Sequence, residues 1–175
     1  MFITQDIDDS IMEFTKNLIM WNMEDEQNNI PIEDRKPVYI YILSYGGQLD
    51  QIMTLIDVIN LSKMKIKTIN LGVCASAGCL LLMSGTKGER YAIKNSWGLV
   101  HQGSGSTGGT AVQVEAQTQN YKKILEMVKK LILEKTNITP AQYSKKKLQE
   151  WYVYGEDMIK LGIVDHIVDD ITQII

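Results

Sequence analysis

The chain has 175 residues, of which 45% are hydrophobic and 22% are charged, and its formal net charge is −3. This length is enough for one sizeable core, so we expect a single domain spanning residues 1–175. A weakly acidic chain lacks the clustered basic surface that neutralises phosphates, which argues against nucleic acid as a partner. No apolar stretch approaches the ~20 residues that cross a bilayer, and no leader pattern opens the chain. We therefore expect a cytoplasmic protein without membrane contact.

The first part of the chain predicts alternating helices and strands. Apolar residues fall on one face of a helix over residues 8–23, and the polar residues 24–35 predict a surface loop. The apolar, β-branched and aromatic run at 38–43 is typical of a strand covered on both faces. Helical spacing over 49–64 and strand character over 67–73 follow. This strand–helix–strand order predicts that the two strands are parallel.

The segment 71–82 sets Ser76 among small residues between two apolar runs, a pattern typical of a strand that turns sharply into a buried helix. Free N–H groups at the helix N-terminus would stabilise negative charge that develops on a substrate oxygen. The simpler interpretation is that Ser76 only caps the helix. Gly46-Gly47 also follows a strand end, so we expect it to meet Ser76 at one edge of the sheet.

The two cysteines flank this serine. Cys74 and Cys79 have a spacing that suits neither a zinc site nor a usual disulfide, and we interpret them as small core residues in a reducing compartment. The only low-complexity stretch, Gln102–Thr110, lacks the Lys-Ser or Lys-Thr that completes a phosphate-binding loop. We expect no cofactor and no metal.

Short strands are predicted over 90–93 and 98–101, the second closed by His101, which is either structural or catalytic. The glycine-rich segment 102–110 is either a flexible loop or an exposed edge that pairs with a peptide. The long helix predicted over 112–136 exceeds what a small sheet needs for cover, so we expect it to project into a partner subunit.

The C-terminal part predicts a short helix from Thr139, an extended segment over 151–154, a helical turn over 156–161 and a final strand over 163–168. The basic run Lys145-Lys146-Lys147 is interpreted as a solvated helix face.

Four ordered stretches together resemble the family of Clp protease proteolytic subunits (ClpP). Residues 41–47, Tyr-Ile-Leu-Ser-Tyr-Gly-Gly, resemble the family's Tyr-Ile-Asn-Ser-Pro-Gly-Gly, and Gly72–Gly78 resembles Gly-x-Ala-Ala-Ser-Met-Gly. Residues 95–102 and 161–165 complete the set. The spacing also agrees, with 29 residues from Gly47 to Ser76 and 25 from Ser76 to His101.

The resemblance implies an α/β, crotonase/ClpP-like fold with repeated βαβ units and a protruding handle helix, the handle region covering about 103–136. It also implies polypeptide substrates and a homo-oligomer of two heptameric rings, a tetradecamer. The match begins almost at Met1, without the segment that forms the family's axial pore loops. We therefore expect a peptidase chamber subunit that works without ATP rather than one that depends on a AAA+ unfoldase.

The resemblance further assigns site residues. Ser76 would be the nucleophile and His101 the general base of a serine-type endopeptidase. The backbone N–H groups of Gly47 and Ala77 would form the oxyanion hole. The substrate backbone would pair with the strand containing Gly103, Ser104 and Gly105.

The third triad member is where the chain departs from the family. The family's aspartate matches Lys146 here, and Glu150, a few residues on, is the nearest carboxylate that could reach His101. A backbone carbonyl, an amide or a water are other ways to orient the ring. Two further functions stay open: a catalytically inactive or weakly active structural ring subunit, and an acyl-CoA hydratase or isomerase of the same fold.

Overall fold

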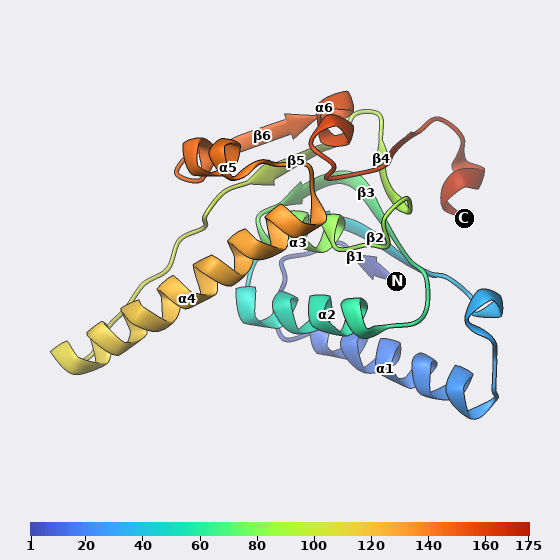
Figure 1. The fold of residues 1–175 in the computed structure, drawn as a ribbon, viewed down its shortest axis with the longest axis horizontal. Helices are drawn as coiled ribbons and strands as arrows, with labels where there is room; N and C mark the ends of the chain where they lie inside the picture. The colour runs from blue at the N-terminus through green and yellow to red at the C-terminus, as the bar shows by residue number, and fades with distance from the viewer.

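The computed structural model describes residues 1–175 and shows a seven-stranded, mostly parallel sheet with helices packed against it (Figure 1). The strands are β1 (Phe2–Ile3), β2 (Val38–Ser44), β3 (Ile66–Ala75), β4 (Arg90–Ile93), β5 (Trp97–Val100), β6 (Trp151–Tyr154) and β7 (His166–Val168). The helices are α1 (Ile11–Gln27), α2 (Leu49–Leu61), α3 (Ala77–Met83), α4 (Ala111–Lys135), α5 (Pro140–Lys146) and α6 (Gly155–Lys160). Two 3-10 turns, η1 (Ile32–Asp34) and η2 (Ile171–Ile174), complete the chain.

The sheet confirms the predicted parallel strands. Its order is β1-β2-β3-β4-β7, with every neighbouring pair parallel. The long strand β3 pairs with β4 through its first half and with β5 through its second half. Strand β6 is the exception, because it lies antiparallel to β5. The units β2-α2-β3 and β3-α3-β4 are the repeated βαβ units expected from the sequence.

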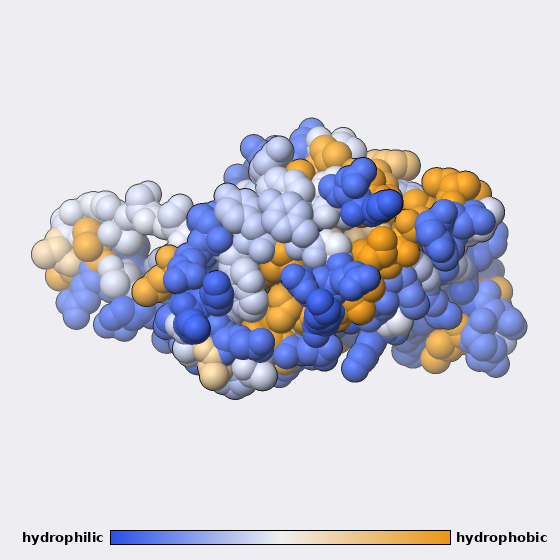
Figure 2. Space-filling view, turned by 90° about the horizontal axis from the view of Figure 1, so that it is seen from above, coloured by the Kyte–Doolittle hydropathy of each residue, from blue (hydrophilic) through white to orange (hydrophobic).

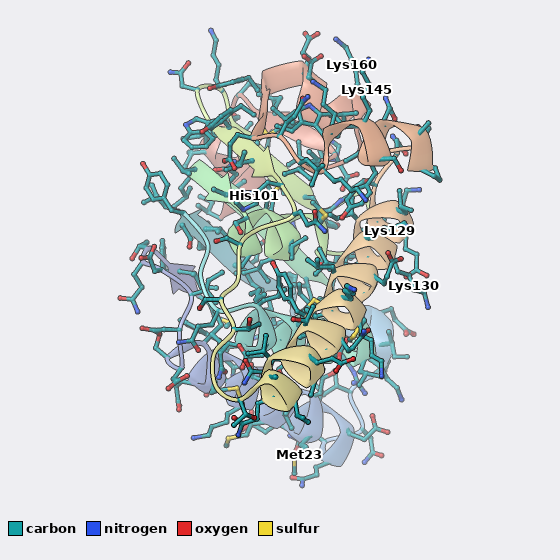
Figure 3. All side chains as sticks on the ribbon, turned by 90° about the vertical axis from the view of Figure 1, so that its left-hand side faces the viewer. Met23, His101, Lys129, Lys130, Lys145 and Lys160 are labelled. Carbon is teal, nitrogen blue, oxygen red and sulfur yellow. The ribbon has the colours of Figure 1, made fainter.

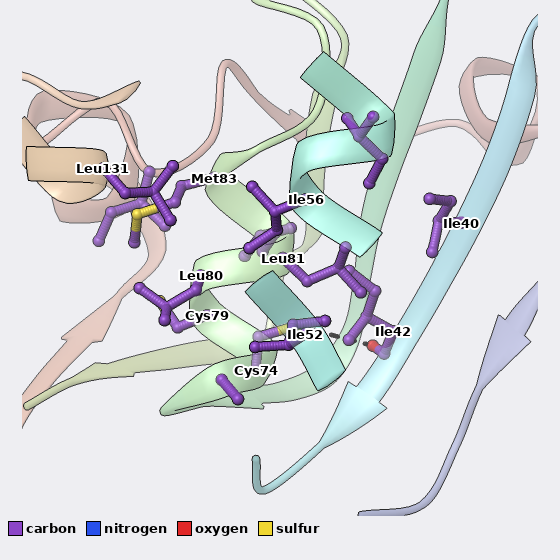
Figure 4. Close-up of a cluster of buried hydrophobic side chains, with 14 of the residues drawn as sticks. Ile40, Ile42, Ile52, Ile56, Cys74, Cys79, Leu80, Leu81, Met83 and Leu131 are labelled. Atoms are coloured by element: carbon purple, nitrogen blue, oxygen red, sulfur yellow. Dashed lines mark hydrogen bonds between the residues drawn. The ribbon is translucent and has the colours of Figure 1, made fainter. Parts of the chain in front are cut away.

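The core lies between the sheet and the helices α2 and α3 (Figure 4). Ile40 and Ile42 of β2 face Ile52 and Ile56 of α2, and all four side chains are fully buried. Burial of an isoleucine side chain contributes ~1.5–3 kcal/mol, so these contacts fix how the β2-α2-β3 unit packs. The turn that follows β2 is thereby held close to the start of α3.

Several boundaries differ from the sequence prediction by one to four residues, and the end of α1 and the start of β7 are two of them. The helix α1 continues to Gln27, because its polar last turn lies on exposed faces, and it ends where Asn29 adopts a φ of 55°. The final strand begins only at His166. The N–H groups of Ile163 and Val164 bond to the carbonyl of Met158 at the end of α6 instead of joining the sheet ladder.

Cys74 and Cys79 are buried and unpaired, which confirms them as core residues. Burial raises the pKa of the Cys79 thiol to about 12 and also raises the pKa of Cys74. Both thiols are therefore protonated at neutral pH and are not candidates for the nucleophile.

The helix α4 projects beyond the body of the molecule (Figure 1). Its 25 residues bury only Val128, Leu131 and Ile132, all in its second half. Figure 2 shows the projecting end with apolar side chains among hydrophilic ones. The predicted excess length of this helix is thus confirmed. No helix in the chain is both long enough and apolar enough to cross a membrane.

A buried ion pair ties the C-terminal elements together. The guanidinium of Arg90 donates to both carboxylate oxygens of Asp165, at 2.8 and 2.6 Å, and to the carbonyls of Lys135 and Gly162 at 2.8 and 2.7 Å. The side chains of Arg90 and Asp165 are 4% and 16% exposed. Burial acts to raise the pKa of Asp165, but the hydrogen bonds and charge of Arg90 outweigh it and hold this pKa below its ordinary value.

The replacement Asp165→Asn is expected to lower the free energy of unfolding by ~3–5 kcal/mol at neutral pH, because it leaves a buried guanidinium unpaired. A carboxylate with a depressed pKa stabilises the fold above its unfolded pKa, and this contribution is lost as the pH falls. The difference between wild type and variant should therefore narrow below about pH 4. Urea unfolding at pH 7 and pH 3 measures it. Asp157→Asn, which breaks only an exposed pair with Lys160, is the control.

Candidate active site

Ser76 occupies the sharp turn between β3 and α3. Its φ of 53° and ψ of −121° lie in a region that non-glycine residues rarely adopt. The conformation is held by backbone hydrogen bonds, from the Ser76 N–H to the carbonyl of Leu99 at 3.0 Å and from the Cys79 N–H to the Ser76 carbonyl at 2.9 Å. The hydroxyl makes no capping hydrogen bond. Ser76 is thus the N-cap residue of α3 by position, but its side chain does not cap the helix.

The turn after β2 lies directly against this serine. A Cβ on Gly46 would meet the Ser76 Cβ at 2.7 Å, so only glycine permits this approach. The Ile7 N–H donates to the Gly46 carbonyl at 2.7 Å, and the Gln48 N–H donates to the Ile7 carbonyl at 2.8 Å. The N–H of Gly47 makes no hydrogen bond. The N–H of Ala77, the first residue of α3, has no intrahelical acceptor either.

His101 comes directly after β5, and Glu150 comes directly before β6. In the antiparallel ladder Val100 is opposite Trp151, so the next pair outward is His101 opposite Glu150. Their side chains meet, with His101 Nδ1 and Glu150 Oε1 2.9 Å apart. The Gln102 N–H donates to the Lys147 carbonyl at 3.1 Å, which holds the two segments together beyond the ladder.

This contact sets the state of the imidazole ring. A carboxylate accepts hydrogen bonds, so Nδ1 is the donor in this contact, and in the neutral ring Nε2 is then the nitrogen with the free lone pair. The His101 Nε2 atom is buried and has no hydrogen-bond partner, and no hydrogen bond joins it to the Ser76 hydroxyl. The ring is 23% exposed and the Glu150 side chain is 55% exposed. The arrangement thus offers a free base at one nitrogen and a carboxylate at the other.

Lys146, which matches the family's aspartate in the sequence comparison above, does not lie beside the histidine in this way. Its Nζ atom lies 6.0 Å from the centre of the Trp151 ring. The carboxylate at His101 Nδ1 belongs to Glu150 instead. The sequence left this choice open, because the residues between α5 and β6 carry no apolar pattern from which their register can be read.

One cavity of about 420 Å³ brings the predicted residues together. It is lined by Gly47, Ser76, Ala77 and His101. The turn after β2, which contains Gly47, and the turn after β3, which contains Ser76, therefore meet at one edge of the sheet, as predicted. Gly103 and Ser104 also line it. Gly105 does not; a Cβ there would meet the ring of Tyr121 at 3.2 Å.

The sequence analysis did not assign the apolar wall of this cavity. That wall comes from α3 and α4 and contains Leu80, Met83, Tyr121, Val128 and Ile132. The helical spacing of the α4 residues was visible, but the same spacing is typical of ordinary core packing. Only the tertiary structure shows that this helix face borders the cavity.

The segment after His101 forms neither helix nor strand over residues 101–108, and its residues from Gly103 onward are exposed. Figure 3 shows His101 at the end of a strand and the following chain running alongside α4. Gln117 of α4 holds Gly108 through two hydrogen bonds of 3.1 Å. The backbone groups of residues 103–107 make no hydrogen bond within the chain.

A serine in a strained strand-to-helix turn, a histidine–carboxylate pair and free N–H groups around one cavity are the groups that serine hydrolases use. A family model described as Clp protease matches residues 1–170. The chain therefore belongs to the Clp protease family, a family of peptidases, and has its ClpP/crotonase-like fold.

Two curated relatives are similar over most of the chain. The ATP-dependent Clp protease proteolytic subunit 2 of Bifidobacterium longum is 33% identical over 137 residues, which are 78% of this chain and 66% of the relative. The ATP-dependent Clp protease proteolytic subunit 1 of Bacillus cereus is 30% identical over 134 residues, which are 77% of this chain and 69% of the relative.

Proposed function

We propose that this chain is a serine endopeptidase in which Ser76 is the nucleophile, His101 the general base and Glu150 the carboxylate that orients the histidine. The observation that carries the proposal is the 2.9 Å contact of His101 Nδ1 with Glu150, in a histidine that shares one cavity with Ser76. The freed Nε2 then has the lone pair that a serine hydroxyl needs for activation.

In the proposed reaction, Ser76 Oγ adds to the carbonyl carbon of the scissile peptide while its proton passes to His101 Nε2. The carbonyl oxygen becomes an oxyanion that accepts hydrogen bonds from the N–H groups of Gly47 and Ala77. The C–N bond breaks, and His101 returns the proton to the leaving amine. Water, activated by the same histidine, then hydrolyses the acyl-enzyme. Ser76 and His101 have to close to hydrogen-bonding distance, as catalytic groups often do only when substrate binds.

The substrate of this reaction would be an extended polypeptide. The free backbone around Gly103–Gly105 would pair with the main chain of the substrate, which reads little of its sequence. The apolar wall from α3 and α4 would accept an apolar side chain next to the scissile bond. We therefore expect broad cleavage with a preference for apolar residues.

The projecting helix supports assembly of the chain into a homo-oligomer. No residue in the first half of α4 is fully buried within one subunit, and Val112 is 77% exposed. A second copy would cover this face, in line with the stacked heptameric rings that the resemblance implies. Hydrolysis through Ser76 and His101 consumes no nucleotide, so short peptides should be cleaved without ATP. The names of both relatives call them ATP-dependent, which supports an ATPase partner for this chain against the expectation from the short N-terminal match.

A fluorophosphonate probe tests the proposal. This reagent reacts with activated serine hydroxyls, so the wild-type protein should be labelled at Ser76, as located by peptide mass spectrometry, and His101→Ala should not. Unlabelled wild-type protein in its assembled state would contradict the peptidase and favour a structural ring subunit. Turnover of a crotonyl thioester by unlabelled protein would favour the hydratase or isomerase instead.

A further inference from the structure

An exposed aromatic cluster lies beside the candidate active site, and the mechanism above does not use it. It is centred on Trp97, the first residue of β5. The Trp97 ring lies 5.5 Å from the ring of Tyr152 and 6.4 Å from that of Tyr154, both on β6. Tyr45 packs edge-on against Trp97 with ring centres 6.2 Å apart. Tyr45 and Tyr154 are 67% and 58% exposed, so hydrophobic burial alone does not account for the cluster.

Each ring of the cluster belongs to a segment that carries part of the site. Tyr45 directly precedes Gly46-Gly47, the turn with the free N–H. Trp97 is the first residue of β5, which His101 directly follows, and Tyr152 lies two residues after Glu150. Trp97 therefore contacts, through side chains alone, the segments that bear the oxyanion donor and the orienting carboxylate.

The Gly46-Gly47 turn needs such a contact because its two glycines leave the backbone conformationally flexible. Gly46 and Gly47 have φ values of 111° and 145°, and paired glycines restrict the chain less than any other residues. Ile7 holds the turn from one side through two backbone hydrogen bonds. On the other side, Tyr45 stands where the resembling family pattern has a proline, which would have fixed one backbone angle.

We propose that Trp97 is a positioning residue. Through its contact with the Tyr45 ring, it fixes the position of the Gly46-Gly47 turn, here called the oxyanion turn, relative to His101 and Glu150. This inference rests on the proposed peptidase function and extends it. Donors for an oxyanion act only when they are fixed before the reaction, and a small displacement is costly. Loss of the Trp97 ring should therefore destabilise the oxyanion intermediate more than it weakens substrate binding.

The test compares two peptide inhibitors, an aldehyde and the matching alcohol. Ser76 Oγ adds to the aldehyde carbon, His101 takes the hydroxyl proton, and the former carbonyl oxygen becomes the oxyanion in the hole. The alcohol binds without forming this bond. We expect Trp97→Ala to weaken the aldehyde about tenfold more than the alcohol and to lower kcat with little change in KM. Trp97→Phe should retain most of the aldehyde affinity.

A double-mutant cycle separates positioning from general destabilisation. If Trp97 acts through Tyr45, Trp97→Ala should have little further effect on aldehyde affinity in a Tyr45→Ala background. Tyr91→Ala removes a stacked ring from the far part of the same sheet, where Tyr91 lies 5.2 Å from His166, and is the matched control. Equal losses for aldehyde and alcohol, or additive effects of Trp97 and Tyr45, would overturn the inference. A wild type that does not respond to the aldehyde would instead contradict the peptidase function itself.

Discussion

Ser76→Ala, His101→Ala and the double variant are expected to lower kcat/KM for a fluorogenic peptide to one common floor, about 10⁴- to 10⁶-fold below wild type. The physical reason is that nucleophile and base act as one unit. Without Nε2 to accept its proton, the Ser76 hydroxyl is a weak nucleophile, and without the hydroxyl the base has no proton to remove. Steady-state hydrolysis of the same peptide by the three variants measures the effect.

The non-additivity is the informative part of that experiment. If the two single losses multiplied in the double variant, the residues would act independently and the proposed pairing would be wrong. Neither change should disturb folding, because the Ser76 hydroxyl makes no capping bond and His101 is partly exposed. Thermal melting of each variant is the control.

Glu150→Gln is expected to lower kcat for peptide hydrolysis by at least tenfold and by up to ~10⁴-fold. An amide retains the size of the side chain, but its NH₂ group donates to Nδ1 and thereby favours the tautomer with the proton on Nε2. That tautomer cannot accept the Ser76 proton. The amide also removes the negative charge that stabilises the imidazolium formed during the reaction. The measurement is kcat and KM for one peptide, with KM expected to change little.

Lys146→Ala is the matched control for Glu150. Lys146 occupies the position that sequence comparison assigns to the family's aspartate, yet its ammonium lies over Trp151 and not at His101. We expect this variant to retain wild-type kcat. Full activity in Glu150→Gln would show that the 2.9 Å contact does not orient the ring, and a loss confined to Lys146→Ala would return the role to the matched position.

Local sequence was enough to predict most of the elements and part of the site. The apolar run at 38–43 and the helical spacing over 49–64 predicted a parallel βαβ unit, because burial on both faces imposes a pattern on contiguous residues. Gly47, Ser76 and His101 lie past the strand ends where the pattern predicted them, for the same reason. Each follows a patterned strand, and the ends of parallel strands meet at one edge of a sheet.

The contacts of Glu150 and Trp97 could not be predicted from local sequence patterns. The loop before β6 carries no apolar period, so the sequence named Glu150 only as the nearest carboxylate that could reach His101 and left a carbonyl, an amide or a water as alternatives. The choice is made by the antiparallel register of β5 and β6, in which Val100 opposite Trp151 leaves His101 opposite Glu150. A register is a property of two segments some 50 residues apart, and it exists only after both have folded onto the same sheet.

The periodicity of contiguous residues by itself thus predicted the parallel βαβ unit and the strand ends at which Gly47, Ser76 and His101 lie, whereas the crotonase/ClpP-like fold was implied by the ordered motifs that resemble the family. The tertiary structure alone decided which carboxylate lies beside His101, which face of α4 walls the cavity and which ring packs against the oxyanion turn. Those three features depend on distances between segments that are remote in sequence, and such distances are set by strand pairing and packing.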